Sequence, residues 1–394
     1  MAQDADKGAR TARPRLGGRV DPRFRRVGEV FAERLAEVEL GAAVSVIVDG
    51  VSVVDLWGGF ADRRRERAWR RDTLVCCFSA TKVPTALAVL DAVAGGELDL
   101  DAPLVRHWPE FAGEGRETIT LRHVLAHRAG LPGWRQDAGL TAEDLLDGER
   151  MAVALARETP FWTPGEAHGY HARSYGFLLG ALLCRATGET VGERLRRRLT
   201  GPRDLDFQLG LDAAAMERCA DLVPAPAGTA VPEASRPMLR AMGDAGSVTA
   251  AAFAVPPQGR GATNSAAWRA AELPAMNGHC TARGLAGLYA AVLRGDVLPA
   301  ALLDEACRVH SDGEDRVLLQ PTTFGLGFMC SRATLPVGLG DASVGHAGAG
   351  GSVGFADPEA GVAFAFVMNR MRPGAVTGND SALALLDALR DALG

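Results

Sequence analysis

Lysine is nearly absent from this chain of 394 residues. Only two of its 43 basic residues are lysines, Lys7 and Lys82, and the rest are arginines. Arginine serves as the ordinary surface cation, so a lysine that remains needs a reason of its own. A lysine ammonium can lose its proton when it is buried or placed beside another cation, whereas a guanidinium stays charged. Lys82 is therefore a candidate acid/base residue on composition alone.

Other absences narrow the class of protein. No apolar run reaches the roughly 18 residues of a transmembrane helix. The formal net charge of −5 argues against nucleic acid or an anionic membrane as the main partner. The seven cysteines are scattered without a CxxC pair, which favours free thiols in a reducing cytoplasm and indicates no metal site. We expect a cytoplasmic protein without a metal or organic cofactor, and the sequence leaves its oligomeric state open.

The pattern of the chain predicts an arm and two interleaved domains. Residues 1–20 are polar and arginine-rich, which favours a disordered arm over a secretion signal. Residues 21–95 are predicted to form the first part of an α/β domain, and residues 276–394 form its second part. Residues 96–275 are predicted to be a helical domain with the loops of the substrate site.

Hydrophobic periodicity and turn signals predict the individual elements. Asp49-Gly50 between two β-branched runs is a strong hairpin signal. The expected helices are 24–39, 79–95, 121–126, 142–157, 173–186, 282–293 and 381–393. The expected strands are 42–48, 51–57, 323–329, 342–345, 352–356 and 361–369. Because strands occur at both ends, we predict α/β plus all-α architecture: one antiparallel sheet from residues 20–75 and 280–380, flanked by helices, with a helical domain inserted.

The strongest chemical signal is Ser79-Ala80-Thr81-Lys82 at the start of a predicted helix. Positions i and i+3 share one helix face, so the Lys82 amine can reach the Ser79 hydroxyl. The helix N-terminus adds free N–H groups and a positive potential, which favour an oxyanion and an uncharged lysine. With 12 serines and two lysines in the chain, chance gives only about 0.06 such motifs. The motif therefore indicates nucleophilic catalysis by Ser79.

Further segments give this motif a family context. The runs LRHVLAHRAGLPGW, FWTPGEAHGYHARSYGFLLG, FGLGF and VGHAGAGGSVGFADPEAGVAFAFVMN follow it in order. Together they resemble the serine β-lactamase/penicillin-binding-protein superfamily, and within it the family VIII carboxylesterases and related acyltransferases. The resemblance spans about residues 28 to 392. It implies a β-lactamase/transpeptidase-like fold, with Ser79 as nucleophile and Lys82 as its proton partner.

The same resemblance assigns the second motif to Tyr170 in preference to Tyr175. A phenol whose pKa is lowered by nearby Lys82 would accept the Ser79 proton and return it to the leaving group. Tyr175 stands at the start of an apolar helical run, where packing is its expected role.

The third motif falls on His346-Ala347-Gly348. Gly348 permits the close backbone approach that the motif needs. His346 is expected to offer a donor to the substrate or to Tyr170, with its charge at neutral pH left open. The N–H of Ala349 is expected to complete an oxyanion hole with the N–H of Ser79.

Two departures from the family pattern bear on the substrate. His346 replaces a lysine and Ala172 replaces an asparagine, and the resemblance implies that those polar groups hold the carboxylate and amide of β-lactams and cell-wall peptides. We therefore predict a serine hydrolase that cleaves a small-molecule ester through a Ser79 acyl-enzyme. The main alternative is an acyltransferase of secondary metabolism with an amine or alcohol acceptor. A β-lactamase or amide hydrolase is less favoured, and so is a non-catalytic binding protein.

Three other patterns are weaker. Ser352 lies in a GxSxG run, the motif of the α/β-hydrolase nucleophile. However, a strand pattern follows Ser352 and no histidine comes later than His346, so we do not expect Ser352 to be the nucleophile. His123 and His127 are four residues apart without the glutamate of a zincin motif. Cys76 and Cys77 precede Ser79 and are expected to be small core residues.

Overall fold

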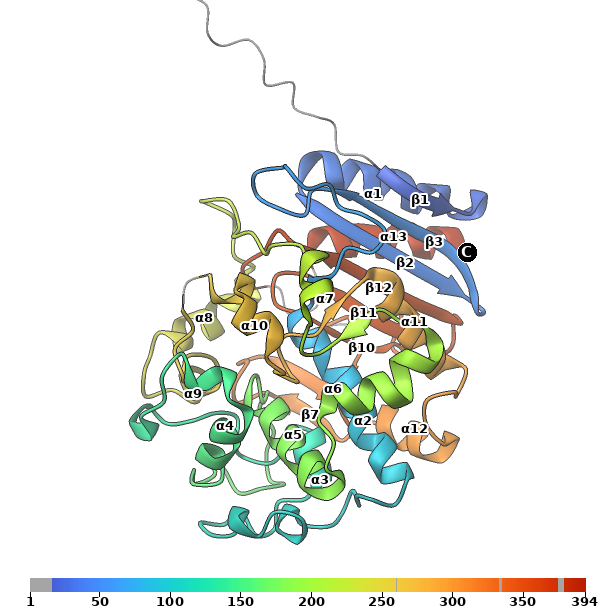
Figure 1. Ribbon diagram of the computed structural model, residues 1–394. Helices are drawn as coiled ribbons and strands as arrows, with labels where there is room; N and C mark the ends of the chain where they lie inside the picture. Colours follow the sequence, from blue (N-terminus) through green and yellow to red (C-terminus); the bar gives the residue numbers. More distant parts are fainter. Residues whose placement is uncertain (1–15, 260, 333–334, 375–378) are drawn as a thin grey trace, which may run out of the picture.

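The computed structural model describes residues 16–259, 261–332, 335–374 and 379–394. Within these residues, a nine-stranded antiparallel sheet has the strand order β1-β3-β2-β12-β11-β10-β9-β8-β7 (Figure 1). Its strands are β1 (Leu16–Val20), β2 (Gly41–Val48), β3 (Val51–Gly59), β7 (Ser311–Glu314), β8 (Pro321–Phe324), β9 (Met329–Cys330), β10 (Val344–Ala347), β11 (Val353–Asp357) and β12 (Val362–Met368). As predicted, the sheet is built from both ends of the chain.

Strands from the two ends of the chain pair inside the sheet. Strand β2 pairs with β12 over seven residues, from Val48 opposite Val362 to Ala42 opposite Met368. The predicted hairpin between β2 and β3 is confirmed, and Asp49 and Gly50 adopt φ values of 48° and 79°. Positive φ at both positions is typical of the primed turn that matches strand twist.

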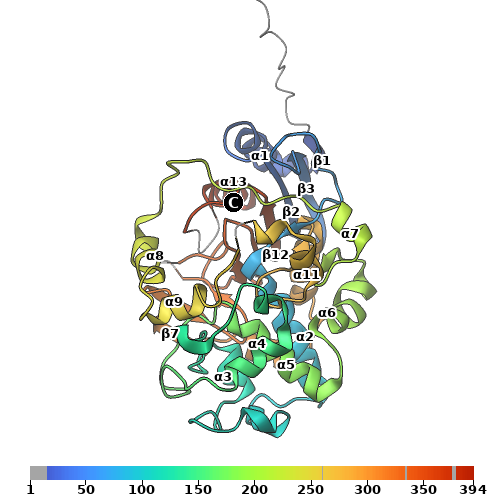
Figure 2. The ribbon, with the colours of Figure 1, turned by 60° about the vertical axis from the view of Figure 1, so that its left-hand side comes forward.

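Helices cover both faces of this sheet (Figures 1 and 2). Helices α1 (Arg25–Glu37) and α13 (Asp380–Leu393) pack against each other, and α11 (Ala282–Leu293) packs on β2, β11 and β12. Alternate residues of β12 enter two different cores, because neighbouring side chains of a strand point to opposite faces. Phe364 and Phe366 pack with the terminal helices, whereas Ala363 and Ala365 lie in the core that contains α11.

The remaining helices lie beside and below the strands of the sheet in Figure 1. Helix α2 (Lys82–Ala94) is buried along most of its length and packs on α5 (Ser174–Thr187). The other α-helices are α3 (Leu121–Leu125), α4 (Gly148–Leu155), α6 (Val191–Arg194), α7 (Ala213–Glu217), α8 (Arg236–Met242), α9 (Val248–Phe253), α10 (Ala266–Ala270) and α12 (Ala300–Cys307). A small second sheet joins β4 (Val75–Cys76), β6 (His279–Cys280) and β5 (Phe207–Gln208).

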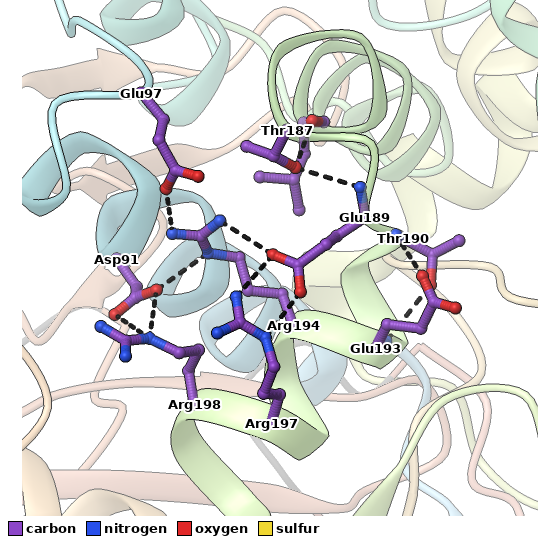
Figure 3. Close-up of polar contacts among 10 residues, drawn as sticks. Asp91, Glu97, Thr187, Glu189, Thr190, Glu193, Arg194, Arg197 and Arg198 are labelled. Atoms are coloured by element: carbon purple, nitrogen blue, oxygen red, sulfur yellow. Dashed lines mark hydrogen bonds and ion pairs between the residues drawn. The ribbon is translucent and has the colours of Figure 1, made fainter.

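A buried ion cluster fixes the C-terminal part of α2 (Figure 3). The Arg194 side chain is only 3% exposed, and its guanidinium lies 2.8 Å from Asp91 and 3.1 Å from Glu189. It also pairs with Glu97 just beyond α2. Arg194 thus satisfies carboxylates from two segments and ties α2 to α6, because a buried charge is stable only when it is paired.

Several element predictions need correction. The expected arm 1–20 falls mainly on residues outside those described, but Leu16–Val20 is a strand and not disordered. The strand predicted over 323–329 is divided into β8 and β9, because Gly327 takes φ +93° and leaves no room for a side chain beside Ala86. The helix predicted over 142–157 starts only at Gly148, where Asp147 caps it. No described helix is long and apolar enough to cross a membrane.

Candidate active site

Ser79 lies on a strained turn that leads into α2. The turn is a short 3-10 helix, η2 (Phe78–Thr81), and Phe78 has a left-handed φ of 46°. The Thr81 hydroxyl donates to the Phe78 carbonyl at 2.5 Å and accepts from the N–H of Gly278 at 2.8 Å. These bonds hold a backbone conformation that is costly for a bulky residue, and such strain is often found at functional sites.

Lys82 is buried against three oxygen atoms. Its Nζ lies 3.3 Å from Ser79 Oγ, 2.8 Å from the carbonyl oxygen of Ala172 and 3.2 Å from that of Ala275. An uncharged amine has two N–H bonds and one lone pair. Because the two carbonyls can only accept, they take the two N–H bonds and leave the lone pair facing the Ser79 hydroxyl.

Burial also sets the charge of Lys82. Its side chain is fully enclosed, and desolvation lowers its pKa well below the ordinary value for lysine. Desolvation favours the uncharged amine, which is the form that can take a proton. The composition argument for Lys82 as an acid/base group therefore has a structural basis.

Tyr170 reaches the site from the loop that precedes α5. The centroid of its ring lies 4.6 Å from Lys82 Nζ, against 5.7 Å for the ring of Tyr175. The expectation that Lys82 lowers the pKa of Tyr170 is wrong: burial raises that pKa, and a hydrogen bond with Ser79 offsets only part of the rise. The physical reason is that a buried phenolate loses its hydration, and the negative charge of Asp315 raises the pKa further. Tyr170 is thus a neutral phenol that can donate a proton.

Asp315 holds the Tyr170 segment in place and was missed by the sequence analysis. Its carboxylate is 1% exposed, and Oδ1 accepts from the N–H groups of Tyr170 at 3.0 Å and of Val317 and Leu318 at 2.8 Å. Its Oδ2 accepts from the Thr322 hydroxyl at 3.0 Å. A carboxylate that binds backbone N–H groups belongs to no sequence motif. Asp315 is also 145 residues from Tyr170 in the chain, so no local pattern connects the two residues.

The third motif brings the end of β10 against the turn of Ser79. A side chain on Gly348 would put its Cβ 1.9 Å from the carbonyl oxygen of Cys77, so only glycine fits there. Strand β10 packs on η2 as a result. The backbone N–H groups of Ser79 and Ala349 have no backbone acceptor within the described part of the chain. Both are available to an oxyanion.

His346 is buried and uncharged. Burial lowers its pKa to about 3. The Nδ1 atom lies 2.7 Å from the carbonyl oxygen of Ala347, which can only accept, so Nδ1 carries the proton. Its Nε2 atom therefore presents a lone pair. The expectation that His346 offers a donor is wrong for this atom, which is an acceptor.

These residues meet at one cavity of about 230 Å³. Ser79, Tyr170 and His346 lie in its wall, and most of the rest is apolar. Helices α8 and α9, which lie side by side in Figures 1 and 2, contribute Met238, Leu239, Met242 and Phe253. Leu318, Met329 and Met371 complete the apolar part, and Arg372 is the one charged residue among the described lining residues. Larger surface hollows lie elsewhere and contain none of the predicted site residues.

The structure leaves the weaker candidates outside this site. Ser352 is buried and does not line the cavity. His123 and His127 already use Nδ1 to accept from backbone N–H groups, those of Thr120 and His171. Within the described residues, no group of three or more His, Cys, Asp or Glu side chains is arranged to hold a metal ion.

A serine paired with a buried lysine at the start of a helix, beside the end of a strand of an antiparallel sheet, points to the active-site serine hydrolases. Comparison with known proteins identifies the family. The model of the Beta-lactamase family matches residues 27–388, so the chain belongs to the Beta-lactamase family. It is an enzyme of this serine hydrolase class, and the predicted β-lactamase/transpeptidase-like fold is confirmed.

Three relatives illustrate the similarity. Esterase/beta-lactamase LipL of Mycobacterium tuberculosis is 35% identical over 91% of this chain and 83% of its own length. The crystal structure of a family VIII carboxylesterase has 33% identity and a TM-score of 0.86, with 96% of this chain and all of that chain covered. A penicillin-binding protein homologue from Caulobacter crescentus has 34% identity and a TM-score of 0.85 over the same shares of the two chains.

Proposed function

We propose that the protein is a carboxylesterase that cleaves a small-molecule ester through an acyl-enzyme on Ser79. The observation that supports this most directly is the environment of Lys82 Nζ, whose two carbonyl contacts leave its lone pair for the Ser79 hydroxyl. The relatives named as esterases agree with this activity.

In the acylation step, Lys82 takes the Ser79 proton while Oγ attacks the ester carbonyl. The new ammonium has three N–H bonds, and the same three oxygen atoms are in place to accept them. The N–H groups of Ser79 and Ala349 would hold the oxyanion. As the C–O bond breaks, the alkoxide takes a proton from neutral Tyr170, which Lys82 reprotonates. The alcohol then leaves.

Deacylation reverses these roles. A water molecule in the place of the alcohol gives its proton through Tyr170 to Lys82 and attacks the acyl carbonyl. Collapse of the second tetrahedral intermediate returns the proton to Ser79 and releases the acid. Only Lys82 holds the extra proton between the steps, because Tyr170 passes each proton on. A single buried charge suits a largely apolar cavity.

The cavity also bears on the substrate class. Its methionine, leucine and phenylalanine side chains favour an apolar acyl or alcohol group. An uncharged His346 in place of a lysine, and Ala172 in place of an asparagine, remove groups that would bind the carboxylate and amide of a β-lactam. We therefore propose esters as the main substrates, with weak action on β-lactams.

Acyl transfer is the second candidate function. The cavity that contains Ser79 is walled mainly by apolar side chains, and such a site favours an alcohol over water when the alcohol fills it. We also propose a reducing, cytoplasmic location, because all seven cysteines are free thiols.

Intact-protein mass spectrometry with p-nitrophenyl butyrate tests the proposed function. Wild-type enzyme should gain the mass of one butyryl group, and Ser79→Ala should gain none. Ser352→Ala is the matched control, since Ser352 is a buried serine whose Oγ has no hydrogen-bond partner among the described residues. It should acylate like the wild type. The proposal is refuted if the wild type forms no adduct and releases no nitrophenolate. It is also refuted if the adduct persists in Ser79→Ala. Release that is faster with added alcohol would favour acyl transfer.

A further inference from the structure

We infer that His346 recognises a hydrogen-bond donor on the alcohol part of the ester, so that the preferred substrates are esters of alcohols that carry a second hydroxyl or N–H group. This inference rests on the proposed esterase function and specifies its substrate class. Its basis is one buried acceptor atom and the position of the His346 ring beside the ring of Tyr170.

The acceptor is His346 Nε2. The side chain is 2% exposed, and Nε2 has no hydrogen-bond partner among the described residues. Because Nδ1 donates to the Ala347 carbonyl, Nε2 carries no proton and can only accept. A buried polar atom without a partner costs free energy, and a bound group that supplies the missing donor recovers it.

The position of His346 indicates which half of the ester supplies this donor. The ring centroids of His346 and Tyr170 are 5.9 Å apart, and both residues line the cavity beside Ser79. In the proposed mechanism Tyr170 gives its proton to the leaving oxygen, so the alcohol group must lie next to Tyr170. The alcohol is therefore the part of the substrate that reaches His346.

The chemistry of the site limits the kind of alcohol. Imidazole with a pKa of about 3 is uncharged at neutral pH, so it binds a neutral donor and gives an anion no attraction. The surrounding methionine and leucine side chains favour a short carbon chain between the ester oxygen and the donor. A glycol monoester is the simplest member of this class. An acceptor alcohol would occupy the same place in the reverse direction, so glycols should also be the better acyl acceptors.

Three butyrate esters test this inference: ethyl, 2-methoxyethyl and 2-hydroxyethyl butyrate. The methoxy ester has nearly the inductive effect of the hydroxy ester but carries a methyl group in place of the hydroxyl hydrogen, so it has no donor, and the ethyl ester lacks the second oxygen altogether. We expect wild-type kcat/KM to be about tenfold higher for the hydroxyethyl than for the methoxyethyl ester, the worth of one buried hydrogen bond. The ratio should fall to about one in His346→Phe, and His346→Gln, which keeps an acceptor, should retain a preference.

The ratio is taken within each variant, so an overall loss of activity in His346→Phe does not affect it. A wild-type ratio near one would overturn the inference even if no His346 variant folds. A preference for the hydroxyethyl ester that persists in His346→Phe would also overturn it. So would an equal loss of kcat/KM on all three esters in His346→Phe, because that result would mean that His346 accepts from Tyr170 and not from the substrate. Failure of the proposed function would give a different result, because none of the three esters would then be hydrolysed in a reaction that depends on Ser79.

Discussion

Removal of the Asp315 carboxylate should loosen the Tyr170 segment and lower both stability and activity. In Asp315→Ala, three buried backbone N–H groups and one hydroxyl lose their acceptor. Each unsatisfied buried donor costs about 1–3 kcal/mol, and neighbouring losses do not add fully. We expect the free energy of unfolding to fall by about 4 kcal/mol. In Asp315→Asn, Oδ1 can still accept, so we expect a loss of about 2 kcal/mol.

The effect on catalysis distinguishes positioning from simple destabilisation. A shift of Tyr170 by about 1 Å should lower kcat/KM by about 100-fold in Asp315→Ala. The negative charge of Asp315 also raises the pKa of Tyr170. In the folded Asp315→Asn enzyme that pKa should fall, and the loss of activity at alkaline pH should begin at a lower pH than in the wild type. A loss of packing alone would not move this limb.

Urea unfolding and the pH dependence of kcat/KM measure these effects. Asp312→Asn is the matched control three residues earlier in the chain, because Asp312 is half exposed and pairs with exposed Arg332. Its effect should be below about 1 kcal/mol. The reasoning is refuted if Asp315→Ala resembles this control in both stability and kcat/KM, or if the alkaline limb of Asp315→Asn coincides with that of the wild type.

Two further predictions concern stability. Burial lowers the folded-state pKa to about 3 to 4 in three histidines: His171, His279 and His346. They take up protons only on unfolding, so the free energy of unfolding should fall as pH drops from 6.5 to 5. The expected fall is about 1.4 kcal/mol per pH unit for each histidine. Urea unfolding at several pH values checks this, and a flat profile would contradict it. Arg194→Met removes the buried cation of the cluster and leaves Asp91 and Glu189 with only their more exposed partners, Arg198 and Arg197, so it should cost about 2 kcal/mol in the same assay. This cost should exceed that of Arg26→Met, whose pairs are exposed, and equal effects would contradict the role of the cluster.

The sequence was sufficient for elements with a local signal. The hairpin at Asp49-Gly50 and the helix over 282–293 follow from turn chemistry and periodicity, and the structure confirms both. The pairing of Ser79 with Lys82 follows from helix geometry, and the two side chains are within 3.3 Å. In each case the decisive interaction joins residues close in the chain.

Features that depend on distant contacts could not be predicted. Asp315 reaches the N–H group of Tyr170 across 145 residues of chain, and a buried aspartate on a turn has no distinguishing pattern. The pKa of Tyr170 is raised by burial, which depends on the packing of distant segments. The acceptor character of His346 Nε2 follows from a local bond, that of Nδ1 to the next carbonyl, but the ring orientation that makes this bond is set by packing. Sequence identifies which groups meet at the site, but packing decides their protonation.

The central claim is that Lys82 is uncharged in the free enzyme and faces Ser79. Because the chain has only two lysines, protein labelled with carbon-13 at lysine Cε should give two NMR signals, and Lys82→Met identifies the one from Lys82. A pH titration of that signal then measures the pKa of Lys82 directly. Burial predicts that Lys82 titrates well below the ordinary lysine value and that its signal is that of an uncharged amine at neutral pH. Two lysines that titrate together near the ordinary value would contradict the account.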